Sequence, residues 1–140
     1  MKKLLLLLLI GPLLFASDLK TEQKIYDLII HTLVPNTKDI KVWSDTAENK
    51  TLLKTIPNIT LVEKAQNADF LLLQNQEKLP GIKGIVFVSN YKLLQKPNTS
   101  AIGGFFWQKG RPNILFLRPN LNKHNIKLPQ SMQEYIEDEI

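Results

Sequence analysis

Two short apolar runs constrain the fold of this chain more than any other feature. Residues 68–73 are apolar apart from Asp69, and residues 84–88 have the sequence Gly-Ile-Val-Phe-Val. Each run has the length of a strand and lacks the alternation of apolar and polar residues that is typical of a strand with one solvated face. We therefore expect two strands buried on both faces, which requires a sheet that is covered on each side.

The first half of the chain supplies helices and further strands. A first helix is predicted from residue 21 onward by apolar residues at helical spacing, and it ends at Pro35. Those apolar residues are Ile25, Leu28, Ile29 and Leu33. Strands are expected over residues 40–43 and 59–62. Between them, Asp45 with Glu48 three residues later resembles a capping box that opens a helix to residue 56.

The second half predicts a short helix, a hairpin and a closing helix. Ser89 and Asn90 are suitable caps for a helix over residues 91–94. Residues 101–108 and 113–117 flank a turn that contains Gly110, which predicts a β-hairpin. After Pro129 a last helix is expected, with one face made of Met132, Tyr135, Ile136 and Ile140. Together these elements predict a single domain of the α/β class (mixed α+β), with a mixed β-sheet flanked by helices.

The N-terminus has the pattern of a secretory signal peptide. Lys2 and Lys3 precede an apolar run that continues to Phe15, and the small residues Ala16 and Ser17 follow. This order of charged, apolar and small residues is the one that a signal peptidase cuts. An uncleaved membrane anchor is the alternative, but the run is shorter than the ~20 residues that a spanning helix needs. We expect a signal peptide over residues 1–17, a domain over residues 18–140 in the periplasm, and no membrane span in the mature form.

Composition excludes several classes of protein. The chain has no cysteine, so it forms no disulfide, carries no thiol nucleophile and is not a lipid-anchored lipoprotein. Its net charge of +5 falls to about +3 without Lys2 and Lys3, and its lysines are scattered. Nucleic-acid-binding proteins usually gather positive charge on one face or element, so we expect no nucleic-acid partner. The acidic C-terminal cluster is either a solvated surface or a contact surface for a basic partner. It consists of Glu134, Glu137, Asp138 and Glu139.

The motifs of common enzyme and cofactor sites are missing from the sequence. There is no Gly-x-Ser-x-Gly elbow, no His-Glu-x-x-His motif and no glycine-rich phosphate-binding fingerprint. His31 and His124 lack neighbouring Asp, Glu or His residues at the spacing of metal ligands. We therefore expect no catalytic residues, no metal site and no cofactor, and a protein that is not an enzyme.

The predicted hairpin carries the densest group of candidate binding residues. Along a strand, side chains alternate between faces, so Phe105 and Trp107 share one face and Phe106 takes the other. Large aromatic side chains beside cations suit cation–π contact with a ligand or a hot spot for a protein partner. We predict a partner- or ligand-binding site at Phe106, Trp107, Lys109, Arg111 and Asn113. In the alternative interpretation all three aromatic side chains belong to the core of a sheet buried on both faces.

Several segments together resemble the YfiR-like family of small periplasmic regulatory proteins. The resemblance is carried by a first helix over Glu22–Leu33, a strand with Trp43, the apolar segments Ala68–Leu73 and Ile85–Ser89, a Gly-Gly hairpin from Gly103 to Leu121, and a closing segment Ile126–Ile136. It implies a mixed α/β sandwich without catalysis. It also implies a role in the periplasm as a restraint on the sensor region of an inner-membrane diguanylate cyclase, or as a partner of other membrane signalling proteins such as histidine kinases. The chain lacks the cysteines frequent in that family, which excludes a redox-controlled release of the partner.

Two functions are therefore expected from different classes of protein. The leading one is a non-catalytic binding or regulatory module whose partner is an inner-membrane receptor protein. The alternative is a small-molecule-binding periplasmic protein that resembles one lobe of a solute-binding protein, with its ligand near Asn90, Tyr91 and Lys109. The oligomeric state is left open, a homodimer included.

Overall fold

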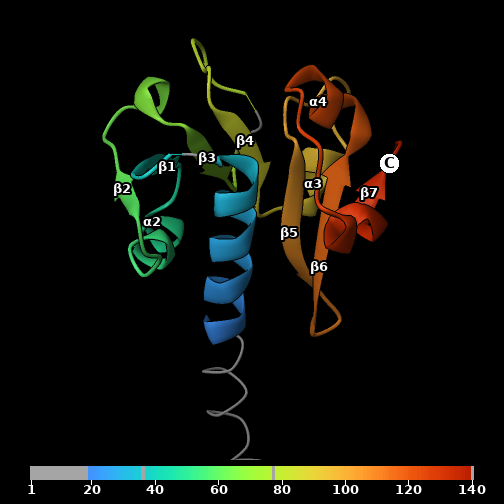
Figure 1. Ribbon diagram of the computed structural model, residues 1–140, viewed down its shortest axis with the longest axis horizontal. Helices are drawn as coiled ribbons and strands as arrows, with labels where there is room; N and C mark the ends of the chain where they lie inside the picture. Colours follow the sequence, from blue (N-terminus) through green and yellow to red (C-terminus); the bar gives the residue numbers. More distant parts are fainter. Residues whose placement is uncertain (1–18, 36, 77, 140) are drawn as a thin grey trace, which may run out of the picture.

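The computed structural model describes residues 19–35, 37–76 and 78–139, and these form a single domain around a seven-stranded mixed sheet (Figure 1). The strands lie side by side in the order β2-β1-β3-β4-β5-β6-β7. Their bounds are β1 Ile40–Ser44, β2 Ile59–Leu61, β3 Phe70–Leu73, β4 Ile85–Val88, β5 Gly103–Gln108, β6 Arg111–Leu117 and β7 Ile136–Glu137. The predicted mixed sheet is confirmed, whereas the predicted signal peptide over residues 1–17 lies outside the described residues.

The first five strands are parallel and follow the order 2-1-3-4-5, which is that of flavodoxin-like doubly wound sheets. After β1 the chain adds β2 on one side and then crosses to add β3 on the other. The carboxyl ends of β1 and β3 therefore border the crevice where such sheets bind ligands. β6 runs antiparallel to β5, and β7 pairs in parallel with β6, so β2 and β7 are the two edges.

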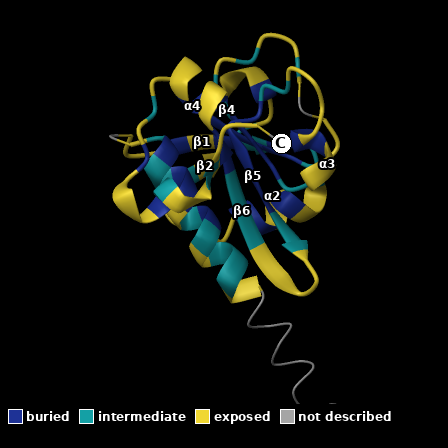
Figure 2. Cartoon of the chain, turned by 90° about the vertical axis from the view of Figure 1, so that its right-hand side faces the viewer, coloured by how far each residue is buried: buried dark blue, intermediate teal, exposed yellow. Residues whose placement is uncertain are grey.

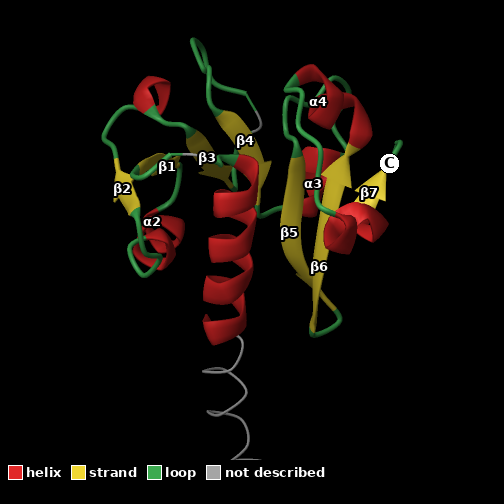
Figure 3. Cartoon of the chain, viewed as in Figure 1, coloured by secondary structure: helices red, strands yellow, loops and turns green. Residues whose placement is uncertain are grey.

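Helices cover both faces of the sheet (Figure 3). The N-terminal helix, residues 19–33, lies across one face together with α2 (Ala47–Leu53), α4 (Arg118–Lys123) and the 3₁₀ helix η2 (Gln130–Tyr135). The other face is covered by the 3₁₀ helix η1 (Ala65–Asn67) and by α3 (Tyr91–Leu94). Within the described ranges, no helix combines the length and the apolarity that crossing a membrane requires.

The two apolar runs are buried strands, as predicted, and they lie at the centre of the sheet. All four residues of β3 are fully buried, and so are Phe87 and Val88 of β4. Phe70, Leu72 and Phe87 point toward the N-terminal helix, while Leu71, Leu73 and Val88 belong to the layer under α3. Figure 2 shows the buried centre in dark blue and the exposed end of the β5–β6 hairpin in yellow. Burying each such side chain contributes about 1.5–3 kcal/mol.

The closing helix was predicted with the wrong geometry. Residues 130–135 form η2, a 3₁₀ helix, and Ile136 then enters β7, where it pairs with Phe116 of β6. The free edge of β6 offers unpaired backbone groups, which favour a strand over a further helical turn. Met132 is buried as expected, but Ile136 belongs to the sheet, and Ile140 lies outside the described residues. The helix α4, directly after β6, was not predicted.

Candidate functional site

A cleft of about 440 Å³ lies at the carboxyl edge of the parallel strands. Its walls come from the first turns of the N-terminal helix, from α2 and from β5, and its floor from the residues that follow β3 and β4. Figure 1 shows the start of the N-terminal helix, α2 and the β5–β6 hairpin at the same end of the molecule. This is the edge at which parallel α/β sheets bind ligands, and the volume is in the usual range of roughly 300–1,000 Å³ for small-molecule sites.

The carboxylate of Asp45 fixes the loop beside this cleft. It accepts hydrogen bonds from the backbone N–H groups of Gln74 (2.9 Å), Asn75 (2.8 Å) and Gln76 (3.2 Å). The sequence pattern predicted Asp45 as the cap of α2, and this prediction is wrong. The cap is Thr46, whose hydroxyl accepts from the N–H of Asn49 at 3.2 Å. Because Asp45 directly follows β1, its side chain reaches the end of the neighbouring β3 and joins the two strand ends.

A second set of hydrogen bonds joins α2 to the ends of β3 and β4. Asn49 is buried, and its side-chain amide donates to the hydroxyl oxygen of Ser89 at 3.1 Å. Asn90 donates from its amide to the backbone carbonyl of Gln74 at 3.2 Å, and its side-chain oxygen caps α3 by accepting from the N–H of Lys92. Asn49, Gln74 and Ser89 all line the cleft, so its floor is polar, neutral and held in place.

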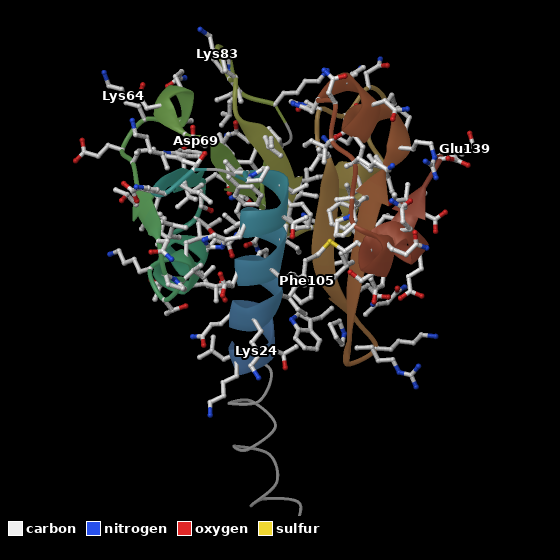
Figure 4. The ribbon with its side chains drawn as sticks, viewed as in Figure 1. Lys24, Lys64, Asp69, Lys83, Phe105 and Glu139 are labelled. Carbon is white, nitrogen blue, oxygen red and sulfur yellow. The ribbon has the colours of Figure 1, made fainter. Side chains whose placement is uncertain are left out.

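Aromatic side chains form the wall opposite that floor. The indole N–H of Trp107 donates to Glu22 Oε1 at 2.5 Å, a contact between residues 85 positions apart in the sequence. The ring of Phe105 makes edge-to-face contacts with Trp107 (5.8 Å between centroids) and with Tyr26 (5.3 Å). Figure 4 shows Phe105 between the N-terminal helix and β5. Each such pair adds about 0.5–1.5 kcal/mol beyond the burial of its surface.

Tyr26 lies beneath this wall with only 2% of its surface exposed. Burial, and to a smaller extent the carboxylate of Glu22, raises the pKa of its phenol well above the usual value of 10.0. The hydroxyl therefore stays protonated even above pH 10.0, where an exposed tyrosine ionises, and it acts as a neutral hydrogen-bonding group.

The structure divides the five predicted site residues between the cleft and the end of the hairpin. Trp107 and Phe106 both line the cleft, and they lie on opposite faces of β5 as expected. The ring of Phe106 packs against that of Tyr91, with 4.8 Å between the ring centroids. Lys109 and Arg111 are exposed at the turn, outside the cleft. Asn113 is half-buried, and its amide donates to the backbone carbonyl of Arg111 at 3.1 Å. Phe106 and Trp107 are therefore partly buried, Phe105 is a core residue, and the two cations form a separate surface.

The residues expected around a small ligand are also divided. Asn90 caps α3, Tyr91 is 37% exposed beside Phe106, and Lys109 lies on the turn. Sequence analysis missed Glu22, Asn49, Gln74 and Ser89 as cleft residues. Gln74 and Ser89 directly follow the two apolar strands, and this position was the signal that could have indicated them. For Glu22 and Asn49 the sequence contains no comparable signal.

The titratable groups of the described residues do not gather into a metal site. No three His, Asp or Glu side chains among them lie close enough together to hold a metal ion. The Nδ1 atom of His31 lies 2.8 Å from Asp27 Oδ1 on the N-terminal helix, and His124 is exposed after α4. The cleft itself offers hydrogen-bonding groups, aromatic surface and carboxylates.

These features define a class, an α/β domain with a flavodoxin-like strand order and a ligand-sized cleft at its carboxyl edge. No protein-family model matches the chain, and no curated protein does. Among solved structures, the chain is similar to a conserved domain protein from Vibrio cholerae O1 biovar El Tor, with a TM-score of 0.57 at 12% sequence identity. The similarity covers 81% of this chain and 58% of that one, so this chain spans less than two thirds of its length. The comparison shows the fold, and a fold alone does not define a function.

Proposed function

We propose that the chain is a non-catalytic binding or regulatory module of the periplasm that acts on an inner-membrane signalling protein. The proposed partner is a diguanylate cyclase or a histidine kinase, as in the YfiR-like family that the sequence resembles. The observation that supports a protein partner is the pair of cations at the end of the β5–β6 hairpin. Lys109 and Arg111 are exposed, and neither forms an ion pair with another described residue.

A regular β-hairpin backbone carries these cations. The β5–β6 ladder continues to the pair Gln108 and Arg111, and the two turn residues, Lys109 and Gly110, have φ angles of +52° and +75°. Positive φ at both positions is characteristic of the tight type I′ turn, which matches the twist of the strands. At the base, Trp107 is anchored on Glu22. A backbone held by a continuous ladder loses little conformational entropy when it binds a partner.

An apolar groove of about 380 Å³ lies beside the hairpin. Pro112 and Ile114 of β6 line it together with Leu28 and Tyr135, whose side chains are unusually exposed for apolar residues at 59% and 37%. Protein interfaces typically combine an apolar or aromatic centre with a polar, charged margin. The groove and the hairpin cations have that composition, which favours a partner whose contact surface is apolar at its centre and acidic at its margin.

Affinity capture tests this proposal. The chain from Asp18 onward is immobilised and incubated with detergent-solubilised inner membranes of the native host, and bound proteins are identified by mass spectrometry. We expect a diguanylate cyclase or a histidine kinase, and we expect the variant with Lys109→Ala and Arg111→Ala to capture at least fivefold less of it.

The matched control is the double variant Lys64→Ala and Lys83→Ala. Like the hairpin variant, it removes two positive charges. Figure 4 shows Lys64 and Lys83 at one end of the molecule and Lys24, on the N-terminal helix, at the other. Equal loss of capture in both double variants would mean that the hairpin cations contribute only general charge. Capture of no membrane signalling protein by the unmodified chain would overturn the proposed function.

The cleft supports a second candidate function, the binding of a small molecule. A volume of about 440 Å³ bordered by ordered strand ends is the observation that favours it. A ligand that binds only the folded state, at a hundred times its dissociation constant, adds ~2.7 kcal/mol to the free energy of unfolding. A thermal-shift screen of metabolites against the chain from Asp18 onward tests this function independently of any protein partner.

A further inference from the structure

The cleft at the carboxyl edge of the sheet has a charge opposite to that of the whole chain. The chain carries a net charge of +5 from 18 basic and 13 acidic residues. Among the described residues that line the cleft, however, the charged side chains are Glu22 and Glu48, and no lysine, arginine or histidine lines it. A cavity that carries negative charge in a basic protein selects against anionic ligands and favours cations.

The two carboxylates stand on separate elements that face the same space. Glu22 lies on the first turns of the N-terminal helix, half-buried, where one of its oxygens accepts the indole N–H of Trp107. A carboxylate has about four acceptor positions, so this bond leaves capacity for a ligand's donors. Glu48 lies on the first turn of α2 and is exposed. Different N–H donors of one ammonium group can thus reach carboxylates on two sides of the cleft.

The remaining lining groups suit the uncharged part of such a ligand. Trp107 and Phe106, both partly buried, present aromatic surface, and Leu52 adds an aliphatic side chain from α2. Aromatic faces attract cations and also pack against apolar groups. Asn49 and Ser89 supply neutral hydrogen-bonding groups on the floor, already oriented by their mutual hydrogen bond of 3.1 Å.

We propose that this cleft binds a small organic cation, an amine with an aromatic or aliphatic body. Its ammonium group is met by Glu22 and Glu48, and its body packs against Trp107 and Phe106. The proposal rests on the second candidate function and names the chemical class of the ligand. It is independent of the hairpin cations, which lie outside the cleft.

Three probes of similar size and different charge test the proposal. They are phenethylamine as the cation, 2-phenylethanol as the neutral analogue and 3-phenylpropanoate as the anion. The reporter is the fluorescence of Trp107 in the variant Trp43→Phe, because Trp43 lies outside the cleft, in the apolar layer on the other face of the sheet. We expect phenethylamine to bind at least tenfold more tightly than either analogue, and to bind more weakly as salt concentration rises.

Isosteric variants identify the carboxylates. Glu22→Gln keeps an acceptor for the indole N–H while it removes the charge, and Glu48→Gln removes the second charge. We expect each change to weaken phenethylamine binding roughly three- to tenfold. Glu134→Gln, on exposed η2 outside the cleft, is the matched control and should leave the affinity unchanged.

The outcomes separate the inferred ligand class from the function on which it rests. If 3-phenylpropanoate or 2-phenylethanol binds as tightly as phenethylamine, the cleft is a ligand site but its charge does not select the ligand, and the inference is wrong. If a thermal-shift screen finds ligands and all of them are anions, the inference is likewise overturned while small-molecule binding stands. If no probe and no screened metabolite binds, both the inference and the second candidate function fail.

Discussion

Trp107 belongs both to the aromatic wall of the cleft and to the base of the hairpin, so its replacement tests how this end of the molecule is held together. The side chain is partly buried against the core layer under the N-terminal helix, and its indole N–H donates to Glu22. Arg111 lies four residues further along the hairpin and is exposed. The structure therefore predicts a large loss of stability for Trp107→Ala and almost none for Arg111→Ala. If both side chains belonged only to an exposed binding surface, neither substitution would change stability.

The expected magnitudes follow from burial and from the hydrogen bond. Trp→Ala in a fully buried site costs about 3–5 kcal/mol, and partial exposure of Trp107 lowers its packing contribution to roughly 2 kcal/mol. Loss of a partly solvated hydrogen bond to a carboxylate adds about 1 kcal/mol. Trp107→Ala should thus reduce the free energy of unfolding by ~3 kcal/mol. Arg111→Ala should stay within about 0.5 kcal/mol of the unmodified chain.

Urea denaturation followed by far-UV circular dichroism measures both changes. With a slope of roughly 1.5 kcal/mol per molar urea, a loss of 3 kcal/mol moves the midpoint by about 2 M. Trp107→Phe keeps most of the ring packing and should lose only about 1 kcal/mol. A double-mutant cycle of Trp107→Phe with Glu22→Ala should give a coupling energy of about 1 kcal/mol for the hydrogen bond.

Two results would refute this reasoning. If Trp107→Ala changes the free energy of unfolding by less than about 0.5 kcal/mol, the indole does not anchor the hairpin. If Arg111→Ala lowers the free energy of unfolding by more than about 1 kcal/mol, the end of the hairpin is part of the stabilising structure. Loss of partner capture in its variants would then result from destabilisation of the fold and not from the loss of a contact.

Three further predictions concern the sheet, the strand-end loop and the buried phenol. Gly103→Ala would place a Cβ in steric overlap with the carbonyl oxygen of Leu115, so it should lower the free energy of unfolding by about 3 kcal/mol or prevent folding. Gly110→Asn, at an open turn position, should shift the melting temperature by less than about 4 °C. Asp45→Ala removes the acceptor of three backbone N–H groups and should cost about 2 kcal/mol in urea denaturation, with faster hydrogen exchange of those amides. Because the pKa of Tyr26 is raised above 10.0, the folded state retains a proton that the unfolded chain releases, so the free energy of unfolding should fall as pH rises above 10.0, by up to ~1.4 kcal/mol per pH unit. Tyr26→Phe should remove that part of the slope in denaturation series at several pH values, and an unchanged slope would contradict the assignment.

Local patterns in the sequence predicted the elements whose structure depends on neighbouring residues. The cap of α3 by Asn90 and a hairpin turn that contains Gly110 are confirmed because each rests on a few adjacent backbone groups. The turn is shorter than predicted, since Arg111 and Pro112 already belong to β6. The apolar runs predicted buried strands correctly, since every side chain of β3 is inaccessible to solvent.

Features that depend on strand order could not be predicted in this way. Asp45 and Glu48 fit a capping box, yet Asp45 binds the loop after β3, because β1 and β3 are neighbours in the sheet. The cleft has the same origin: Glu22 and Trp107 meet only because the N-terminal helix crosses the sheet beside β5. The sequence predicts which segments are strands, but their order decides which side chains converge at the carboxyl edge.

The two edges of the sheet have a consequence for the behaviour of the protein at high concentration. β2 has three residues and β7 has two, so each edge exposes very few unpaired backbone groups. Long, flat edges recruit strands from other molecules and start aggregation, and short edges do not offer a template of sufficient length. The most apolar strands, β3 and β4, lie between neighbours on both sides. Self-association of the folded protein by continuation of the sheet is therefore disfavoured, and any oligomer should form through side-chain surfaces.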